Sequence, residues 1–429
     1  MLNKGHALIC DSVTFDKISG QYDEDLRKLE DDFYEAKSST DKNCICTFYL
    51  KIQNEQTFSD YLNNECESVF IPSEKDKRNS ALYAKINASH FFKNNEYFGP
   101  VVVGETFFGQ QLHPKIIYEI MSEDGQKKIQ LSAGYFIQQN FGNSNLQSQP
   151  TFSATYSQKN FTAIIGNLNG GPYHQLATQL YSIETGLTNL MENGAQIIFH
   201  DKKQQRYFSD TWIEWKNQTY PGSTEQEHFR AGSSNRYEIP MNKRNKLQLI
   251  GQVYFDHHGG QVNIANASGQ RPPTITLVNY ALGANLQRNL NRQNNKNSFL
   301  NKAQVGVTQF GFSGSPNGRG QGVEIHAGVE SKVLDLYLSH WQGNHFDSFA
   351  GTPYYSSFSK NPNEPNKVIE KTNFIKLRAS KSINLLSKDA IRRAQLSPYL
   401  EYIFDKNAKT NPYTYGLVFQ WKIISTGKK

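Results

Sequence analysis

Hydrophobic and polar residues alternate one by one over long stretches of the chain after residue 80. The clearest case is residues 413–423, where every odd position is aromatic or aliphatic and the even positions are mostly small or polar. The same alternation runs through residues 129–138, 247–256, 278–287 and 395–404. Because successive side chains of a β-strand point to opposite faces, each segment is predicted to be a strand with one apolar and one polar face.

The length of these segments bears on the kind of sheet they form. They run for about ten residues or more, enough to cross a bilayer, whereas strands of soluble proteins average five or six. A soluble β-sandwich gives the same alternation with its apolar face turned inward, so alternation alone leaves both architectures open. No helical pattern of comparable length follows residue 81, apart from residues 175–190. Segment length therefore favours a transmembrane barrel.

The predicted fold is all-β: a transmembrane antiparallel up-and-down β-barrel of about 16 strands, within a range of about 14–18, at roughly twenty residues for a strand and its turn. Residues 80–424 are assigned to this barrel. Residues 1–79 are predicted to be a partly helical or disordered extension, on the periplasmic side. Residues 425–429 form a C-terminal tail. Two long polar regions, 170–193 and 341–371, are expected to be extracellular loops or to fill the lumen.

The amino-acid composition also favours a transmembrane barrel. Hydrophobic residues make up 37% of the chain, yet aromatic residues reach 13%, with 23 Tyr and 27 Phe. A soluble core is built largely from Leu, Ile and Val, while a membrane barrel needs aromatic belts at both interfaces and a polar interior. The mean hydropathy is −0.64, and no apolar run is long enough for a membrane helix. This composition is compatible with a barrel because half of each strand faces water.

The chain carries a net charge of +7 and has a pI near 8.9. Its Lys and Arg residues are scattered, without a basic block, which argues against nucleic acid as a partner. A positive lumen that attracts anionic solutes fits this charge, and so does a solvated surface.

All four cysteines precede the predicted barrel: Cys10, Cys44, Cys46 and Cys66. The spacing of Cys44 and Cys46 does not suit a zinc knuckle, so periplasmic disulfides and free thiols both stay open. The first ten residues lack the apolar core of a signal peptide. Because an outer-membrane protein needs an export signal, we expect a different start or a signal further upstream.

The last predicted strand also carries a recognisable order of residue types. A polar residue is followed two positions later by Gly and then by two hydrophobic residues one residue apart: Thr414, Gly416, Phe419 and Trp421. This order resembles the C-terminal assembly signal of Gram-negative outer-membrane, porin-like β-barrels, although many of those proteins end on the aromatic residue itself. Residues 97–112 and 167–171 are similar to an uncharacterised group of such barrels. The resemblance implies location in the cell outer membrane, contact with outer-membrane lipid, and the barrel assembly machinery as a partner.

Few residues suggest catalysis or metal binding. His257 and His258 follow Asp256, but adjacent residues of a strand point to opposite faces, so a strand-end loop is favoured over a metal site. Outer-membrane phospholipases and lipid A deacylases use Ser and His on the outer wall of the barrel, yet Ser339 and His340 fit no catalytic triad. We therefore assign no catalytic residue, metal or other cofactor, and predict that the protein is not an enzyme.

Charged residues on the polar faces of the strands are the candidates for function. The predicted registers turn these side chains into the lumen, as pore residues: Lys376, Arg378, Glu324, Glu330, Glu401 and Asp256. Acidic and basic groups facing each other across a lumen are typical of a general porin. The predicted function is a passive porin-like channel for small polar or anionic solutes. The alternatives are a component of an export or assembly complex, with residues 1–79 contacting a periplasmic or membrane partner, and an outer-membrane lipid-modifying enzyme.

Overall fold

The computed structural model describes two short strands near the N-terminus and most of the chain from residue 80 to residue 426. The two short strands, β1 (Ile45–Phe48) and β2 (Glu67–Phe70), pair antiparallel. From residue 80 onward the gaps are residues 99–101, 144, 189–190, 202–205, 221–224, 260–272, 291–298, 387–391 and 406–410. Apart from the backbone of these two strands, the predictions for the extension before residue 80, for its cysteine side chains and for its partner fall outside the described residues.

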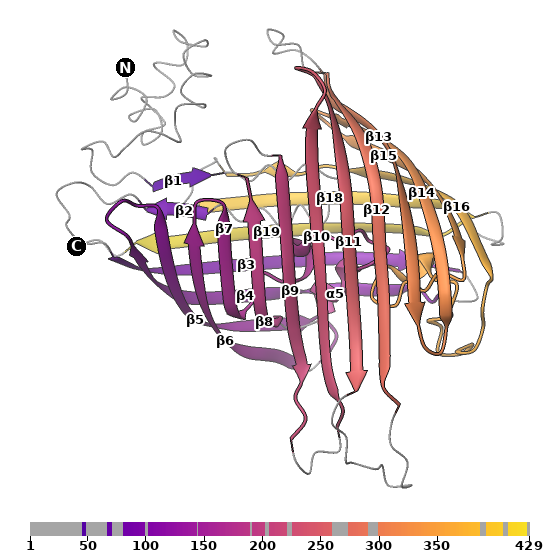
Figure 1. Ribbon diagram of the computed structural model, residues 1–429, viewed down its shortest axis with the longest axis horizontal. Helices are drawn as coiled ribbons and strands as arrows, with labels where there is room; N and C mark the ends of the chain where they lie inside the picture. Colours follow the sequence, from indigo (N-terminus) through magenta and orange to yellow (C-terminus); the bar gives the residue numbers. More distant parts are fainter. Residues whose placement is uncertain are drawn as a thin grey trace.

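The strands of the larger sheet form a closed ring in which the paired strands are antiparallel and follow one another in the chain (Figure 1). They are β3 (Ser80–Glu96), β4 (Glu105–Met121), β5 (Lys127–Asn140), β6 (Leu146–Gln158), β7 (Phe161–Asn167), β8 (Asn193–His200), β9 (Tyr207–Asn217), β10 (Glu227–Pro240), β11 (Asn245–Gly259), β12 (Ile275–Asn289), β13 (Leu300–Gly314), β14 (Gly318–Ser331), β15 (Asp335–Asn344), β16 (Lys371–Ser380), β17 (Ile383–Asn384), β18 (Arg392–Asp405) and β19 (Tyr413–Thr426).

Pairing of β19 with β3 closes this ring. Both β16 and β17 pair with β18, so they act as one interrupted strand. The described residues therefore form a sixteen-stranded antiparallel up-and-down barrel, which confirms the predicted fold.

Burial along the strands is the reverse of that in a soluble sandwich. On β12 the outward residues Tyr280 and Leu282 are 45% and 63% exposed, while the inward residues Asn279 and Asn285 are fully buried. An apolar outside and a polar inside cannot be stable in water but match a lipid-facing wall. Among the described helices, none is long and apolar enough to cross a membrane.

The two ends of the barrel differ in their connections. At the end where β3 begins and β19 finishes, short turns dominate, such as the one after β4, where Gly125 adopts φ +66° and Ser122 Oγ accepts from the Lys127 amide at 2.9 Å. The opposite end, called the long-loop end below, carries residues 168–192 and 345–370. In outer-membrane barrels the short turns face the periplasm and the longer loops face outward. The long-loop end is therefore assigned to the cell exterior.

The two longest connections at the long-loop end pack inside the barrel. Residues 168–192 contain the 3₁₀ turn η1 (Gly171–His174) and the helix α5 (Ile183–Thr188), and residues 345–370 contain η2 (Pro353–Tyr355). The amide of Ser182 donates to the Ala350 carbonyl at 2.8 Å, which ties the two segments together. Of the two uses left open by the sequence, these regions fill the lumen.

Candidate functional site

A cluster of buried side chains crosses the lumen. It joins Leu180 and Phe346 of the two inserted segments to Trp212 on β9 and Ile403 on β18. In the order of the ring, β9 and β18 lie eight strands apart, so they stand on opposite walls. Leu180 and Phe346 are fully buried. Packed apolar groups thus cross the described part of the lumen at this level.

A buried histidine anchors the first inserted segment to the wall. His174 Nδ1 lies 2.9 Å from Asp210 Oδ2 on β9, and its Nε2 lies 2.8 Å from Glu192 Oε2. Tyr181 Oη and the Gly171 amide each donate to Glu192 Oε1 at 2.8 Å. These four contacts either lie within residues 168–192 or join this segment to the inner wall.

Burial disfavours a charged imidazole, but the two carboxylates outweigh burial and raise the pKa of His174 to about 9. Burial likewise opposes charge on Glu192, yet the imidazolium and its hydrogen bonds lower the pKa of that carboxyl. At neutral pH the group is therefore an ion pair with His174 protonated. Because His174 is fully buried, this ion pair holds the inserted segment against β9 and is not accessible to a substrate.

The two tryptophans of β9 point to opposite sides of the wall. Trp212 is buried and stacks on His174, with ring centroids 3.5 Å apart and planes 5° apart. Trp215 points outward and is 42% exposed. Opposite Trp212 on β10 stands Gly232, where an added Cβ would lie 2.6 Å from the indole ring. Only glycine leaves room for the ring at that position.

The six charged residues predicted for the lumen lie on inward-facing positions but are not gathered in one site. Lys376, Arg378 and Glu401 meet on β16 and β18, with Arg378 Nη1 donating to Glu401 Oε1 at 3.2 Å. Lys376 donates to Tyr355 Oη at 2.6 Å. The other three have separate partners: Glu324 accepts from Gln179 at 2.9 Å, Glu330 pairs with Lys302 at 2.8 Å, and Asp256 pairs with Arg230 at 2.8 Å. Their role in a pore stays a prediction.

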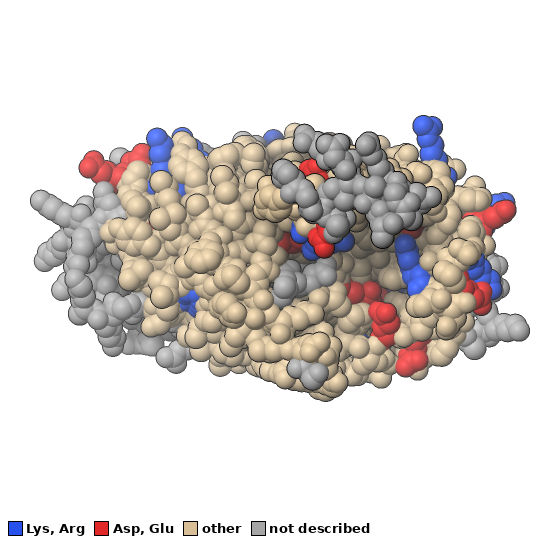
Figure 2. Space-filling view, turned by 90° about the horizontal axis from the view of Figure 1, so that it is seen from below, with Lys and Arg blue, Asp and Glu red and all other residues tan. Residues whose placement is uncertain are grey.

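A cavity lies beside the basic group of β16. Lys93, Lys376 and Arg378 line it together with Glu401 and Tyr399. Within the part of the chain that the structure describes, the Nε and Nη2 atoms of Arg378 are buried and have no hydrogen-bond partner. These two N–H groups form one edge of the guanidinium, the edge that binds a carboxylate or phosphate with two parallel hydrogen bonds. Figure 2 shows acidic and basic side chains close together in a hollow of the surface seen from below.

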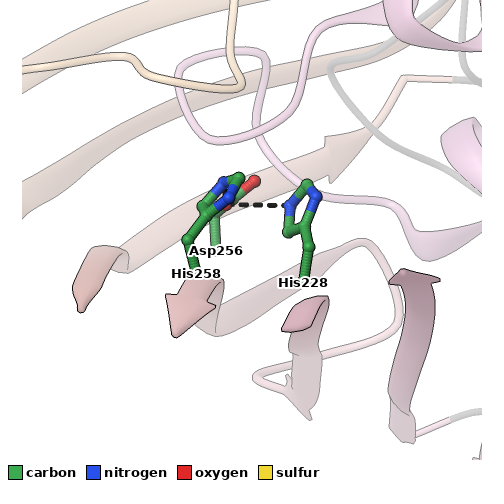
Figure 3. Close-up of side chains that lie close together, drawn as sticks. All are labelled: His228, Asp256 and His258. Atoms are coloured by element: carbon green, nitrogen blue, oxygen red, sulfur yellow. Dashed lines mark hydrogen bonds and ion pairs between the residues drawn. The ribbon is translucent and has the colours of Figure 1, made fainter. Parts of the chain in front are cut away.

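A second charged group lies where β10 and β11 approach the long-loop end. His228, Asp256 and His258 turn their polar atoms toward one another, within 4.8 Å (Figure 3). Both imidazole Nε2 atoms face Asp256 Oδ1, at 3.1 Å from His228 and 2.8 Å from His258. Arg230 Nε holds the other carboxylate oxygen at 2.8 Å. Two nitrogens and one oxygen thus converge, a set that could hold a metal ion.

On the outer wall, a row of residues crosses the same strands. Trp215, Phe229, His257 and Thr276 are successive cross-strand partners on β9, β10, β11 and β12. His257 Nδ1 lies 2.8 Å from the Thr276 hydroxyl. This pair could not be found from the sequence, because only the register of β11 against β12 brings the two residues together.

Ser339 and His340, which were considered from the sequence as catalytic residues of a lipid hydrolase, do not form a pair. Ser339 is buried on the inner side of β15, while His340 lies on the outer side and is 2.8 Å from Asn373 Oδ1. The two residues therefore point to opposite faces of the wall.

The residues that resemble an assembly signal occupy both faces of β19. Thr414 is fully buried and donates to Asn95 Oδ1 at 3.0 Å. Gly416 is also inward, and a Cβ there would come within 2.5 Å of the Tyr399 ring. Phe419 and Trp421 are on the outer side and pack around His90 of β3. Their part in assembly stays a prediction.

Comparison with protein families matches almost the whole barrel. The model of the lipid A 3'-O-deacylase-type family matches residues 73–424. The chain belongs to this family. A search of curated proteins found no match. Membership of the lipid A 3'-O-deacylase-type family, together with the inverted burial of the wall, places the protein in the outer membrane.

Solved structures of outer-membrane porins also match. Pseudomonas aeruginosa OprD is 9% identical, with 81% of this chain and 96% of that chain covered and a TM-score of 0.44. P. aeruginosa OccK2 (OpdF) in complex with glucuronate is 9% identical over 80% and 98%, with a TM-score of 0.43. Salmonella typhi OmpF in complex with daunomycin is 10% identical over 80% and 98%, with a TM-score of 0.46. At such values nothing about solute or activity follows from these structures.

These findings confirm one prediction made from the sequence and contradict another. The protein is an outer-membrane β-barrel of sixteen strands in contact with outer-membrane lipid, as predicted. The prediction that the protein is not an enzyme is wrong, because the family to which the chain belongs is described by an enzymatic activity. The error arose because catalytic groups of a barrel are assembled across strands, and a single strand shows only one of them.

Proposed function

We propose that the protein hydrolyses an ester-linked acyl chain of lipid A, at the outer leaflet of the outer membrane. The observation that carries the proposal is the family match over residues 73–424. The filled lumen supports this function over a passive channel, because the buried cluster between β9 and β18 obstructs the path that solutes would need.

The outer row on β9 to β12 is the proposed place of reaction. It lies near the long-loop end, the level at which outer-leaflet lipid meets the wall. Trp215 and Phe229 stack with centroids 5.4 Å apart, and Phe229 lies 4.9 Å from the His257 ring. Acyl chains pack well against such rings, and the row ends on the hydrogen-bonded pair of His257 and Thr276.

The pair has the parts needed for acyl transfer. In the tautomer with its proton on Nε2, His257 accepts the Thr276 hydroxyl proton at Nδ1 while Oγ1 attacks the ester carbonyl. The proton then passes to the sugar oxygen as the ester bond breaks, which leaves the acyl group on Thr276. Water, deprotonated by the same imidazole, releases the fatty acid and restores the hydroxyl.

The test is release of fatty acid from lipid A by the purified full chain in detergent, measured by mass spectrometry. We expect wild type to release it and His257→Ala and Thr276→Ala to slow release at least ~100-fold, because a positioned base contributes about 10²–10⁴. His340→Ala, a change of the same kind elsewhere on the outer wall, should leave the rate unchanged. An inactive wild type contradicts the proposed function. An active His257→Ala variant contradicts only the assigned site.

A second candidate function is binding or slow passage of small anions. It is favoured by the cavity beside Lys376 and by the two unpaired N–H groups of Arg378. Conductance of single molecules in planar bilayers tests it, because a fully closed lumen gives none.

A further inference from the structure

We propose that His228, Asp256 and His258 bind a divalent first-row transition-metal ion, with Zn²⁺ as the probe. The site lies on the inner side of β10 and β11, across the wall from the outer row. It goes beyond the proposed function and does not depend on ester hydrolysis.

Strand register explains why these residues meet. His228 is the direct cross-strand partner of His258, and Arg230 is the partner of Asp256. Residues two apart on a strand share a face, so all four side chains lie on the inner side. Directly opposed residues have Cβ atoms about 5 Å apart, close enough for two imidazoles to reach a common ion. The four side chains thus form a square fixed by backbone hydrogen bonds.

The hydrogen bonding within the square leaves a role for a cation. Both Nε2 atoms lie close to one oxygen, Asp256 Oδ1, at 3.1 and 2.8 Å, and the imidazole rings stack with centroids 3.8 Å apart. A carboxylate oxygen only accepts, so the Nε2 atom of His228, which is hydrogen-bonded to it, carries a proton when no metal is bound. A metal ion would take the place of a proton on Nε2, and each neutral ring would then carry its single proton on Nδ1. One cation would then satisfy three acceptors at once.

The distances suit such an ion after a small adjustment. Metal–ligand distances of about 2.0–2.1 Å in a tetrahedron separate the ligand atoms by about 3.4 Å. The present separations from Oδ1 are 3.1 and 2.8 Å, so the rings must move outward by a few tenths of an ångström. His258 can do so because its side chain is 40% exposed, which also gives the ion access from solvent.

The surroundings favour a metal held by three ligands. Arg230 Nε keeps Asp256 Oδ2 engaged, so Oδ1 alone faces the imidazoles as a single ligand atom. Two imidazole nitrogens select Zn²⁺ and its first-row neighbours over Ca²⁺ and Mg²⁺, which prefer oxygen. A fourth position stays open for water or an anion, as in catalytic zinc sites.

The test is titration of the chelator-treated full chain with Zn²⁺ by calorimetry, and with Co²⁺ by visible absorption. We expect wild type to bind one equivalent that His228→Ala, Asp256→Asn and His258→Ala each weaken at least ~100-fold. Arg230→Gln, which removes only the partner of Oδ2, should weaken binding about 10–100-fold. Because the ligands must give up protons, affinity should fall as pH falls.

The matched control is His257→Ala, one position from His258 but on the opposite face, which should bind as wild type does. Equal affinity of wild type and the His258→Ala variant would overturn the proposal, since any bound Zn²⁺ would then be adventitious. Loss of binding on His257→Ala as well would also overturn it. Neither readout involves fatty-acid release, so this inference and the proposed function can fail separately.

Discussion

The buried ion pair of His174 predicts that the inserted segment 168–192 loosens in alkaline solution. The pKa of His174 is raised from 6.5 to about 9 by Glu192 and Asp210. A raised pKa means that the folded segment is stabilised when His174 is protonated. This stabilisation is complete below pH 6.5 and is lost as the pH rises to about 9 and beyond.

The magnitude follows from the size of the shift. One pKa unit corresponds to about 1.4 kcal/mol, so a rise from 6.5 to about 9 corresponds to about 3 kcal/mol. His174 is fully buried, so solvent does not screen its two carboxylate contacts. On the acid side, the lowered pKa of Glu192 keeps that carboxylate charged until the pH falls well below 4.5. The segment is therefore most firmly held between about pH 4.5 and 6.5.

The assay is hydrogen exchange by mass spectrometry on peptides covering residues 171–188, corrected for the intrinsic pH dependence of exchange. In wild type, the free energy of local opening should fall by about 3 kcal/mol between pH 6.5 and pH 10. The variant His174→Gln keeps polar atoms near both carboxylates but cannot be protonated in this range. Its opening free energy should be lower at pH 6.5 and should not depend on pH over the same interval.

Two results would refute this reasoning. Opening of wild type that is independent of pH from 6.5 to 10 would show that His174 is not held as an imidazolium. An equal alkaline change in the His174→Gln variant would assign the effect to another group.

Three further predictions concern the wall and the lumen. Phe419→Asp should impair folding, measured as heat-modifiable migration in gels, because a carboxylate on the lipid face costs roughly 2 kcal/mol. The inward Gln420→Asp should be tolerated, and equal loss of folded protein for both variants would contradict the register. Lys376→Gln combined with Arg378→Gln should reduce the anion preference of any conductance, measured as a reversal potential in a salt gradient, and a strongly cation-selective wild type would exclude these residues from the path. Gly232→Ala should destabilise the barrel by about 1–3 kcal/mol in chemical unfolding, since the new Cβ meets a buried indole 2.6 Å away, and an unchanged midpoint would contradict that contact.

Local sequence determined the wall of this barrel. The alternation along residues 413–423 is enough to assign Leu417 and Phe419 to lipid and Thr414 to the lumen, because side-chain direction in a strand depends only on position. The inward placement of Lys376 and Arg378 followed from the same periodicity. The number of strands followed from length, since a bilayer sets how many residues each crossing needs.

The tertiary structure decided what the barrel contains and which residues meet. Polar regions such as 341–371 could equally be outer loops or lumen filler, because their burial depends on partners far away in the chain. His228 meets Asp256 and His258, and His257 meets Thr276, only through the register of neighbouring strands. Strand β11 alone displays only Asp256 and His258 on its inner face, and pairing with β10 brings His228 to them. Chemistry in a barrel is assembled across strands, and periodicity within one strand carries no information about register with the next.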